Sequence, residues 1–565
     1  MKAFLGSRWL HPLLLLLWIA IGTGLRLTQL AAKPPWTDEF STIVFSLGNS
    51  FRTVPLNRAI ALDVLLQPLK PNPGAGITDV VQHLLIESNH PPLYFVLAHW
   101  WMQLWAPNPS GFASVWAARA LPALFGAVSI PAVYGLGWLA FRSRLVGQMA
   151  AAMIAVSPYG IFLAQEARHY TLAILWVVAS LMCLVIATRH IHHRKPLPAW
   201  VALGWVGINF LGISTHYFFS LTLCAEALWL IVLGWHHREQ RGAFSTKSCL
   251  VWRQIFVVAV GTLMGCLVWL PSFCQEGYGG ELTNWIQTGN RGFLAWLSPV
   301  FQALAGWIGM LSLLPIEAPS FSVLIASGLV MLFFFLWAIP ILSRGIIIQL
   351  KQPTTSLITQ LFAVVVLGAI ALFFFFTYAL GIDLTRGARY NFVYFPAVSV
   401  LLGASLAVCW NTPAKMQKHH SLAGKKAVAL IWLMGLISCL TVVCNLGYHK
   451  YYRPELLVPL IQQVSQSPVL IATTHKTHVQ TGEMMGLARE FKLSGSAANP
   501  LFLLAHQAQN PKTSTVALQH TLTQLSRPRD VWLVNFHAPV DLNGCIAAQS
   551  LPIVNGYDYQ LYHCQ

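Results

Sequence analysis

The chain has 565 residues, of which 56% are hydrophobic and 9% are charged, and its formal net charge is +17. Soluble domains carry about 25% charged residues, so this composition excludes an ordinary soluble protein and predicts a chain that crosses the lipid bilayer many times. A basic membrane protein usually places its excess Lys and Arg in cytoplasmic loops, so the charge does not indicate a nucleic-acid partner.

The N-terminal segment combines Lys2 and Arg8 with an apolar run from about His11 to Ala31. This run is longer than the core of a typical signal peptide, so we expect a retained anchor, with cleavage as the alternative. The polar stretch 33–92 that follows is rich in Pro, Gly and Asn, and predicts short surface helices joined by loops.

Ten further apolar runs follow, and together with the first they predict eleven membrane spans. They are centred near 113–140, 145–163, 171–188, 199–215, 217–234, 251–271, 321–343, 355–380, 391–410 and 427–446. Two Trp-containing stretches, 92–106 and 293–314, are expected to lie at or dip into the membrane interface. A thirteen-span arrangement, in which both of them cross, is the alternative.

The loops between these spans give the orientation. With the N-terminus in the cytoplasm, the cytoplasmic loops are almost exclusively basic and contain Glu239 as their one acid. They include 142–144, 189–195, 236–247, 344–351 and 415–426. We therefore expect a multi-pass protein of the cell (inner) membrane whose C-terminal domain is extracytoplasmic.

The tail after residue 448 has ordinary polarity and predicts a separate small α/β domain. Apolar strands are expected at 469–473 and 531–535, and helices near 482–491 and 514–525. Cys545 and Cys564 lie in this tail and can form a disulfide if it is extracytoplasmic. The predicted domains are thus a membrane domain 1–448, including the outer loop 32–92, and the tail 449–565.

Acidic residues are scarce, with 18 Asp and Glu in the whole chain, so the adjacent pair Asp38-Glu39 directly after the first span stands out. A second fragment, Glu87-Ser-Asn-His90-Pro-Pro, combines an acid and a histidine that suit a substrate or a divalent cation. An N-cap for the first pair and a rigid turn for the second are the structural alternatives.

Three later fragments lie on the same predicted face of the membrane. They are Gln165-Glu166-Ala-Arg168-His169-Tyr170, Thr215-His216-Tyr217-Phe218 and Asp383-Leu-Thr-Arg386-Gly-Ala-Arg389-Tyr390. If the first is helical, Gln165, Arg168 and His169 share one face. Arginines on the outer face run against the charge bias of the loops, which favours an anionic ligand such as a phosphate.

These fragments, in this order, resemble the GT-C superfamily of integral-membrane glycosyltransferases, in particular protein O-mannosyltransferases and lipid A aminoarabinose transferases. The resemblance covers roughly residues 10–410, includes His90-Pro-Pro-Leu-Tyr94 and Arg119-Ala-Leu-Pro122, and ends at Arg389-Tyr390 with Pro396. The tail resembles the outer domains of such enzymes only in position and size.

The resemblance implies a hexosyl or pentosyl transferase that uses a polyprenyl-phosphate-linked sugar and a protein, lipid or glycan acceptor outside the cytoplasm. It makes Asp38 the expected base, with Glu39 and Glu166 as further catalytic acids, although several relatives have Asp where this chain has Glu166. The expected phosphate-binding residues are Arg168, Tyr170, His216, Arg386, Arg389 and Tyr390.

Glu87 and His90 remain candidates for substrate or metal binding, and the need for a divalent cation stays open. Two other functions are alternatives for a protein of this composition. One is a polytopic transporter, which would place charges near the middle of its spans, and the other is a lipid-binding membrane subunit.

Overall fold

The computed structural model describes residues 9–241, 246–273, 278–287, 292–412, 424–495, 499–548 and 551–565. The chain divides into two compact units. The helical unit comprises Met1–Leu30, Arg119–Cys274 and Thr283–Tyr448, and the mixed unit comprises Ala31–Ala118, Gln275–Leu282 and His449–Gln565. The predicted basic residues Lys2, Arg8 and Lys415 lie outside the described residues.

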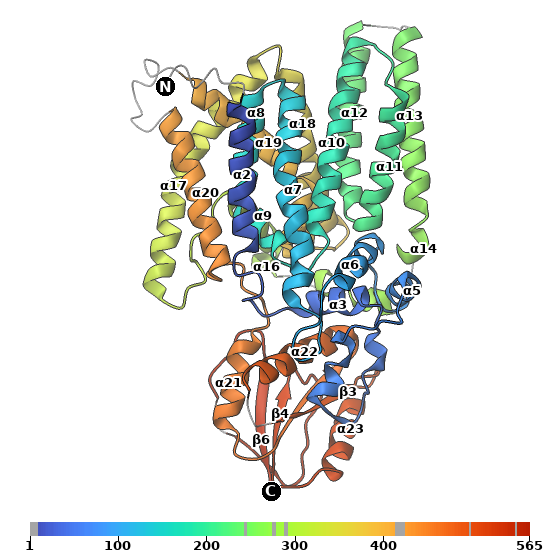
Figure 1. The fold of residues 1–565 in the computed structure, drawn as a ribbon, viewed down its shortest axis with the longest axis vertical. Helices are drawn as coiled ribbons and strands as arrows, with labels where there is room; N and C mark the ends of the chain where they lie inside the picture. The colour runs from blue at the N-terminus through green and yellow to red at the C-terminus, as the bar shows by residue number, and fades with distance from the viewer. Residues whose placement is uncertain are drawn as a thin grey trace. The chain divides into compact units, whose positions relative to one another are not determined.

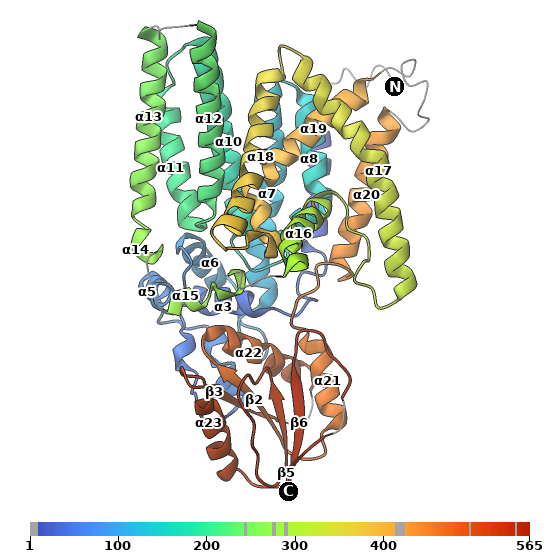
Figure 2. The same cartoon turned by 180° about the vertical axis from the view of Figure 1, so that it is seen from behind.

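The helical unit is built from long apolar helices, and Figures 1 and 2 show α7, α10, α12 and α13 lying along a common direction. In chain order the helices are α2 (Leu10–Leu27), α7 (Val115–Phe141), α8 (Arg144–Ala155), α9 (Pro158–Ala164), α10 (Tyr170–His193), α11 (Ala199–Thr215), α12 (Phe219–Arg241), α13 (Thr246–Leu267), α14 (Leu270–Phe273), α16 (Phe293–Leu311), α17 (Phe321–Lys351), α18 (Ser356–Ala379), α19 (Phe395–Asn411) and α20 (Lys425–Val443). Short 3-10 helices, η3 (Asn284–Ile286), η4 (Leu384–Arg386) and η5 (Ala388–Val393), connect some of them.

Small residues allow some of these helices to pack very closely. α8 packs against α19, where a Cβ atom added to Gly403 would lie 2.7 Å from the backbone nitrogen of Ala150. In lipid, close backbone approach of this kind is a main source of helix association, because the hydrophobic effect does not operate between apolar helices there.

Within the described residues, nine helices are long and apolar enough to cross a membrane, or ten if the bent pair α8 and α9 forms one span. The two helices of this pair meet at 59°, where Ser157 caps α9 and Pro158 lacks the N–H that would continue α8. The polytopic helical fold is confirmed. The predicted count of eleven differs because α11 and α19 have 17 residues each and fall just short, because α8 and α9 count as a span only if the bent pair is taken as one, and because α16, expected at the interface, is long enough to be counted.

The two stretches expected at the interface behave differently. α6 (Leu93–Gln103) has 11 residues, which is only about 16 Å of helix against a hydrocarbon core of about 30 Å. The thirteen-span alternative needs this helix to cross, so its length speaks against that arrangement. By contrast, α16 has 19 residues and is long and apolar enough to span.

The mixed unit contains a six-stranded sheet in the order β1-β3-β2-β4-β6-β5. Its strands are β1 (Ala59–Ala61), β2 (Val469–His475), β3 (Leu501–His506), β4 (Arg529–Val534), β5 (Cys545–Ala547) and β6 (Tyr559–Cys564). Its helices are α3 (Thr37–Ser46), η1 (Phe51–Thr53), α4 (Leu62–Leu65), η2 (Gln67–Leu69), α5 (Ile77–Glu87), α6, α15 (Tyr278–Glu281), α21 (Pro454–Val464), α22 (His478–Leu493) and α23 (Lys512–Thr523).

The three central strands are parallel. β2 pairs with β3 in the register Leu470↔Leu501 and with β4 in the register Leu470↔Val531. One face of the sheet packs against α23, where the core includes Leu470, Leu503 and Leu518. This confirms the predicted α/β tail, including its strands near 469–473 and 531–535 and both of its helices.

The loop after the first span contributes to this same folded unit. It forms the short helices that its composition predicts, and its strand β1 pairs antiparallel with β3 in the register Ala59↔Leu503. The ring of Phe51 stacks on that of His478 in α22 at 4.9 Å, and Lys492 forms an ion pair with Asp63 at 2.5 Å. The structure therefore groups residues 31–118 with the tail, whereas the sequence analysis places this loop in the membrane domain.

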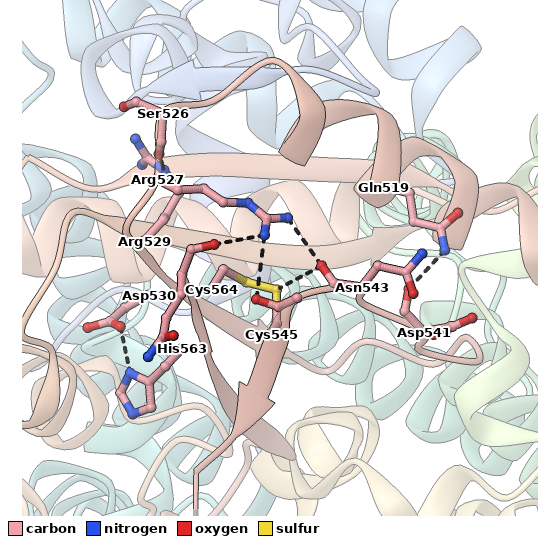
Figure 3. The surroundings of a disulfide bond; sticks show 12 residues. Gln519, Ser526, Arg527, Arg529, Asp530, Asp541, Asn543, Cys545, His563 and Cys564 are labelled. Atoms are coloured by element: carbon pink, nitrogen blue, oxygen red, sulfur yellow. Dashed lines mark hydrogen bonds and ion pairs between the residues drawn. A yellow bond between two sulfur atoms is a disulfide. The ribbon is translucent and has the colours of Figure 1, made fainter.

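A disulfide joins the last two strands. Cys545 and Cys564 are bonded and stand opposite each other in the β5–β6 pair, as the sequence analysis expects for an extracytoplasmic tail. Figure 3 shows the Arg527 side chain reaching the backbone carbonyls beside this bond, with Nη1 donating to Gln565 O at 2.9 Å and Nη2 to Asn543 O at 3.2 Å. These contacts fasten the C-terminal strand to the preceding loop.

Candidate active site

The segment between α9 and α10 is a turn, so the condition under which Gln165, Arg168 and His169 would share a helical face is not met. α9 ends at Ala164, and the Gln165 side chain turns away to donate to the carbonyl of Thr28 at 2.9 Å and to that of Leu25 at 3.3 Å. A helix leaves its last four carbonyls without intrahelical partners. Gln165 thus satisfies the C-terminal end of α2.

Three predicted site residues meet in an aromatic cluster of the helical unit. Tyr170 opens α10, His216 caps α11, and Tyr390 lies in η5. The ring of His216 lies 5.6 Å from that of Tyr170 and 6.1 Å from that of Tyr390. Side chains that are far apart in the sequence are therefore neighbours here, as the proposed phosphate site requires.

Two arginines lie over this cluster. The guanidinium of Arg168 is 5.8 Å from the Tyr170 ring centre, and its residue is only 2% exposed. The guanidinium of Arg389 lies 5.4 Å from the Tyr390 ring and 5.1 Å from the ring of Trp285. The aromatic faces attract these cations and orient their planar forks.

The third arginine, Arg386, is held beside the cluster. Its Nε is 3.4 Å from the buried carboxylate of Asp383, and its guanidinium donates to the backbone carbonyl of Trp285. Asp383 also accepts from the hydroxyl of Thr385 at 2.6 Å. These bonds fix the η4 segment, so Arg386 has a local structural partner in addition to any ligand.

Two members of this cluster are not among the predicted site residues. His169 is fully buried, with its ring 4.6 Å from that of His216, and Trp285 supports Arg389 from the segment before α16. His169 stands beside the predicted Arg168 and Tyr170, so its position in that motif is the available signal. Glu166, from the same turn, is 2% exposed.

A buried acid inside the helices is also absent from the predicted set. The Ser180 hydroxyl oxygen lies 2.8 Å from Glu226 Oε2 of α12 and 3.0 Å from Asn209 Oδ1, so its single proton is shared between these two acceptors. The indole of Trp205 donates to the Ser180 oxygen at 2.9 Å. Glu226 is therefore a buried acid within a helix long and apolar enough to cross a membrane.

The acidic pair of the mixed unit occupies the first turn of α3. Glu39 is fully buried and its carboxylate accepts from the backbone N–H of Trp36 at 3.4 Å, which completes a capping box. Asp38 is half-buried in the same turn, where the helix dipole favours a carboxylate. The capping role is thus taken by Glu39, and Asp38 is the more accessible of the two acids.

The carboxylate of Glu87 is used inside the fold. It accepts from the Ser50 hydroxyl at 2.5 Å and from the backbone N–H of Phe51 at 3.0 Å, and so holds η1 in place. His90 Nδ1 bonds the Ser88 hydroxyl at 3.0 Å. Among the described residues there is no group of three His, Cys, Asp or Glu side chains that could hold a metal ion, so Glu87 and His90 do not fit as a metal site.

The fold and these clusters define a multi-pass α-helical membrane protein with a small α/β domain. No protein-family model and no curated protein sequence matches the chain. Several solved structures of membrane proteins resemble it at low sequence identity.

ArnT from Cupriavidus metallidurans bound to undecaprenyl phosphate is 12% identical, with 94% of this chain and 93% of that chain covered and a TM-score of 0.49. The oligosaccharyltransferase AglB from Archaeoglobus fulgidus, in complex with an inhibitory peptide and a dolichol-phosphate, is 12% identical over 93% of this chain and 70% of that one, with a TM-score of 0.46. The S. cerevisiae protein O-mannosyltransferase Pmt1-Pmt2 complex is 17% identical over 48% and 35%, with a TM-score of 0.32.

Proposed function

We propose that this protein is a glycosyltransferase that moves a sugar from a polyprenyl-phosphate-linked donor to an acceptor on the non-cytoplasmic side of the membrane. The observation that carries the proposal is the cluster of Arg168, Arg389, Tyr170, His216 and Tyr390, gathered in the helical unit from three separate segments. Arg168 is buried and Arg389 is half-buried, and the planar donor fork of each guanidinium suits an anionic ligand.

A phosphate is the anion that suits this arrangement. The guanidinium fork donates two parallel hydrogen bonds to phosphate oxygens, and the aromatic rings fix the direction of the fork. A polyprenyl carrier would keep its apolar tail in the bilayer beside the helices. Because the sugar of such a donor is attached to a lipid phosphate and not to a nucleotide, the transferase needs no glycine-rich nucleotide-binding loop.

The reaction we propose is a direct inverting displacement. The acceptor hydroxyl oxygen forms a bond to the anomeric carbon, its proton passes to Asp38, and the bond from that carbon to the phosphate oxygen breaks. The departing polyprenyl phosphate keeps the bonding electrons, and Arg168, Arg386 and Arg389 stabilise its charge.

Among the three candidate acids, we assign the base role to Asp38. Glu39 is engaged in the helix cap, and Glu166 is almost fully buried, so both are better suited to hold the site than to accept a proton from a diffusing acceptor. We further propose that the N-terminus is cytoplasmic and the mixed unit extracytoplasmic, which the basic loops and the disulfide support.

The test is transfer of radiolabelled sugar from polyprenyl-phosphate donors in membranes that contain the full chain. Asp38→Asn should abolish transfer while donor binding remains, because the variant loses the proton acceptor and keeps the side-chain volume. The matched control is Asp63→Asn, an exposed acid of the same unit that should transfer normally. Normal turnover of Asp38→Asn would remove Asp38 from the mechanism.

One observation favours a second function, transport. Glu226 is a buried acid in a candidate span, bonded to Ser180, and such residues often mark a substrate or proton path. Countertransport of free solute by proteoliposomes, lost in Glu226→Gln, would support a transporter. Label appearing in a new glycosylated product, with no solute exchange, would support the transferase.

A further inference from the structure

The mixed unit contains a cavity of about 490 Å³ that is separate from the acidic pair of α3 and is lined only by residues of this unit. Its volume falls in the range of small-molecule pockets, about 300–1,000 Å³. Thr474 at the end of β2, Gln507 directly after β3 and Asn535 directly after β4 all line it. The cavity therefore lies at the carboxyl ends of the three parallel strands.

This position has a topological reason. The chain runs from β2 through α22 to β3 on one side, then through α23 to β4 on the other side of β2. Where the order of parallel strands reverses in this way, the loops leave in opposite directions and open a crevice in which α/β domains bind ligands. The strand order thus places the cavity at this edge of the sheet, and the loops that follow the strands line it.

Contacts within the mixed unit fix the loops that line the cavity. The backbone N–H of Asn535 donates to the carbonyl of Asp558 at 2.7 Å, and its side-chain oxygen accepts from the Asp558 N–H at 2.8 Å. Gly556 has a φ of +90°, and a Cβ there would lie 1.9 Å from the carbonyl oxygen of Tyr451. The loop that precedes β6 therefore reaches its position against Tyr451 only with glycine at this point.

One of the tyrosines that line the cavity, Tyr557, has a buried hydroxyl. Tyr557 is 7% exposed, and its hydroxyl makes no hydrogen bond within the part of the chain that the structure describes. The Tyr557 ring lies 5.5 Å from that of Tyr452, so two aromatic rings and a hydroxyl line the same wall. A buried hydroxyl without a partner costs free energy, which a bound polar ligand would recover.

The charge of the cavity argues against a phosphate ligand. Lys476 and Asp558 offset each other on its rim. The backbone amides at the start of α22 are already bonded, because Gln480 Oε1 accepts from the N–H of Thr477 at 2.9 Å and from that of Lys476 at 3.1 Å. A helix N-terminus that is capped in this way offers little to an anion.

We propose that this cavity binds an uncharged saccharide. The lining combines the amide side chains of Gln507 and Asn535 with the tyrosine side chains of Tyr452 and Tyr557. The protein itself orients the two amides by hydrogen bonds to His537 and Glu483, and such a neutral polar lining suits sugar hydroxyls. Tyrosine rings present an apolar face to the C–H groups of a sugar ring and a polar tip to its hydroxyls. The site is additional to the transfer reaction proposed above and does not depend on it.

The experiment is saturation-transfer NMR with the purified full chain and three neutral probes, maltose, mannobiose and chitobiose, with glucose 1-phosphate and inorganic phosphate as anionic probes. At least one neutral probe should bind. Tyr557→Phe should weaken it about three- to tenfold, since one hydrogen bond is lost while the ring remains. Because the Tyr557 hydroxyl has no partner in the described structure, this variant should fold normally.

Two matched variants complete the test. Tyr562→Phe removes the hydroxyl of a partly buried β6 tyrosine outside the cavity and should leave binding unchanged. Lys476→Met removes the rim cation and should also leave it unchanged. The proposal is overturned if none of the three neutral probes binds, if Tyr557→Phe binds as well as the wild type, or if only the anionic probes bind and Lys476→Met loses them. No donor is used, so the outcome is independent of the transferase assay.

Discussion

The substitution Glu483→Gln gives a pH test of the mixed unit. Glu483 in α22 is 4% exposed, and burial raises the pKa of its carboxyl from 4.5 to about 8. The side chain of Asn535 donates to its Oε1, and a hydrogen bond with Tyr452 opposes part of the upward pKa shift. At neutral pH the folded protein therefore holds Glu483 protonated, and glutamine has the same shape and charge.

The expected direction follows from proton linkage. Because the folded-state pKa is raised, the contribution of Glu483 is fully favourable below pH 4.5 and is lost as the pH rises towards 8. The slope is ~1.4 kcal/mol per pH unit well below pH 8 and falls off as the carboxyl ionises, so the change from pH 6 to pH 8 costs about 2.3 kcal/mol, or roughly 50-fold in the opening equilibrium. Glu483→Gln should abolish this pH dependence and be more stable than the wild type at pH 8.

Hydrogen exchange measured by mass spectrometry on the full chain in micelles reports this opening. The informative peptides cover α22 and β4, and their rates are corrected for the intrinsic pH dependence of exchange. Asp541→Asn, an exposed acid of the same unit, should behave like the wild type. Equal pH dependence in the wild type and Glu483→Gln would refute the reasoning, as would a variant that is less stable at every pH.

Three further substitutions test other contacts. Arg389→Ala should raise the donor KM more than the acceptor KM, because it removes a proposed phosphate ligand. Arg344→Ala, exposed near the end of α17, is its control, and equal losses for both substrates would indicate a fold defect. Glu87→Gln should destabilise the mixed unit by about 1–3 kcal/mol, because the glutamine side chain has one oxygen where the carboxylate uses two to accept from Ser50 and Phe51. Hydrogen exchange of peptides that contain η1 measures the change, and unchanged exchange would contradict the prediction. Cys545→Ser with Cys564→Ser opens a loop of sequence separation 19 and should cost about 3 kcal/mol. Proteolysis of the β5–β6 hairpin reports it, with Cys224→Ser as control, and equal resistance would count against a stabilising disulfide.

Several expectations from the sequence depended on spacing or composition alone and hold in the structure. The apolar runs become helices, and the tail folds as an α/β domain whose two late cysteines are bonded. Tyr170, His216 and Tyr390, selected from three fragments with the help of the family resemblance, share one cluster, and their role in binding stays a prediction. The arginine fragments were recognisable because cations on the predicted outer face oppose the charge bias of the loops.

Other features could not be read from local pattern. The turn at residues 165–169 looks helical in sequence, but the Gln165 side chain caps α2 instead, and this partner is far away in the chain. Glu226 appears as an isolated acid in an apolar run until Ser180 and Trp205 are seen beside it. The carboxylate of Glu87 looked available to a ligand, and only its contacts with Ser50 and Phe51 reveal its place in the fold.

Hydropathy and charge by themselves determined that this chain is a membrane protein with an α/β tail. A membrane helix and a buried strand can each be recognised from the residues of that segment alone, because the apolar length and the hydrophobic period are local properties. Tertiary structure alone decided that the loop after the first span folds with the tail, since β1 finds its partner in β3 more than four hundred residues later. It also decided that three strand ends surround a cavity, because strand order depends on long-range pairing, which local sequence does not encode.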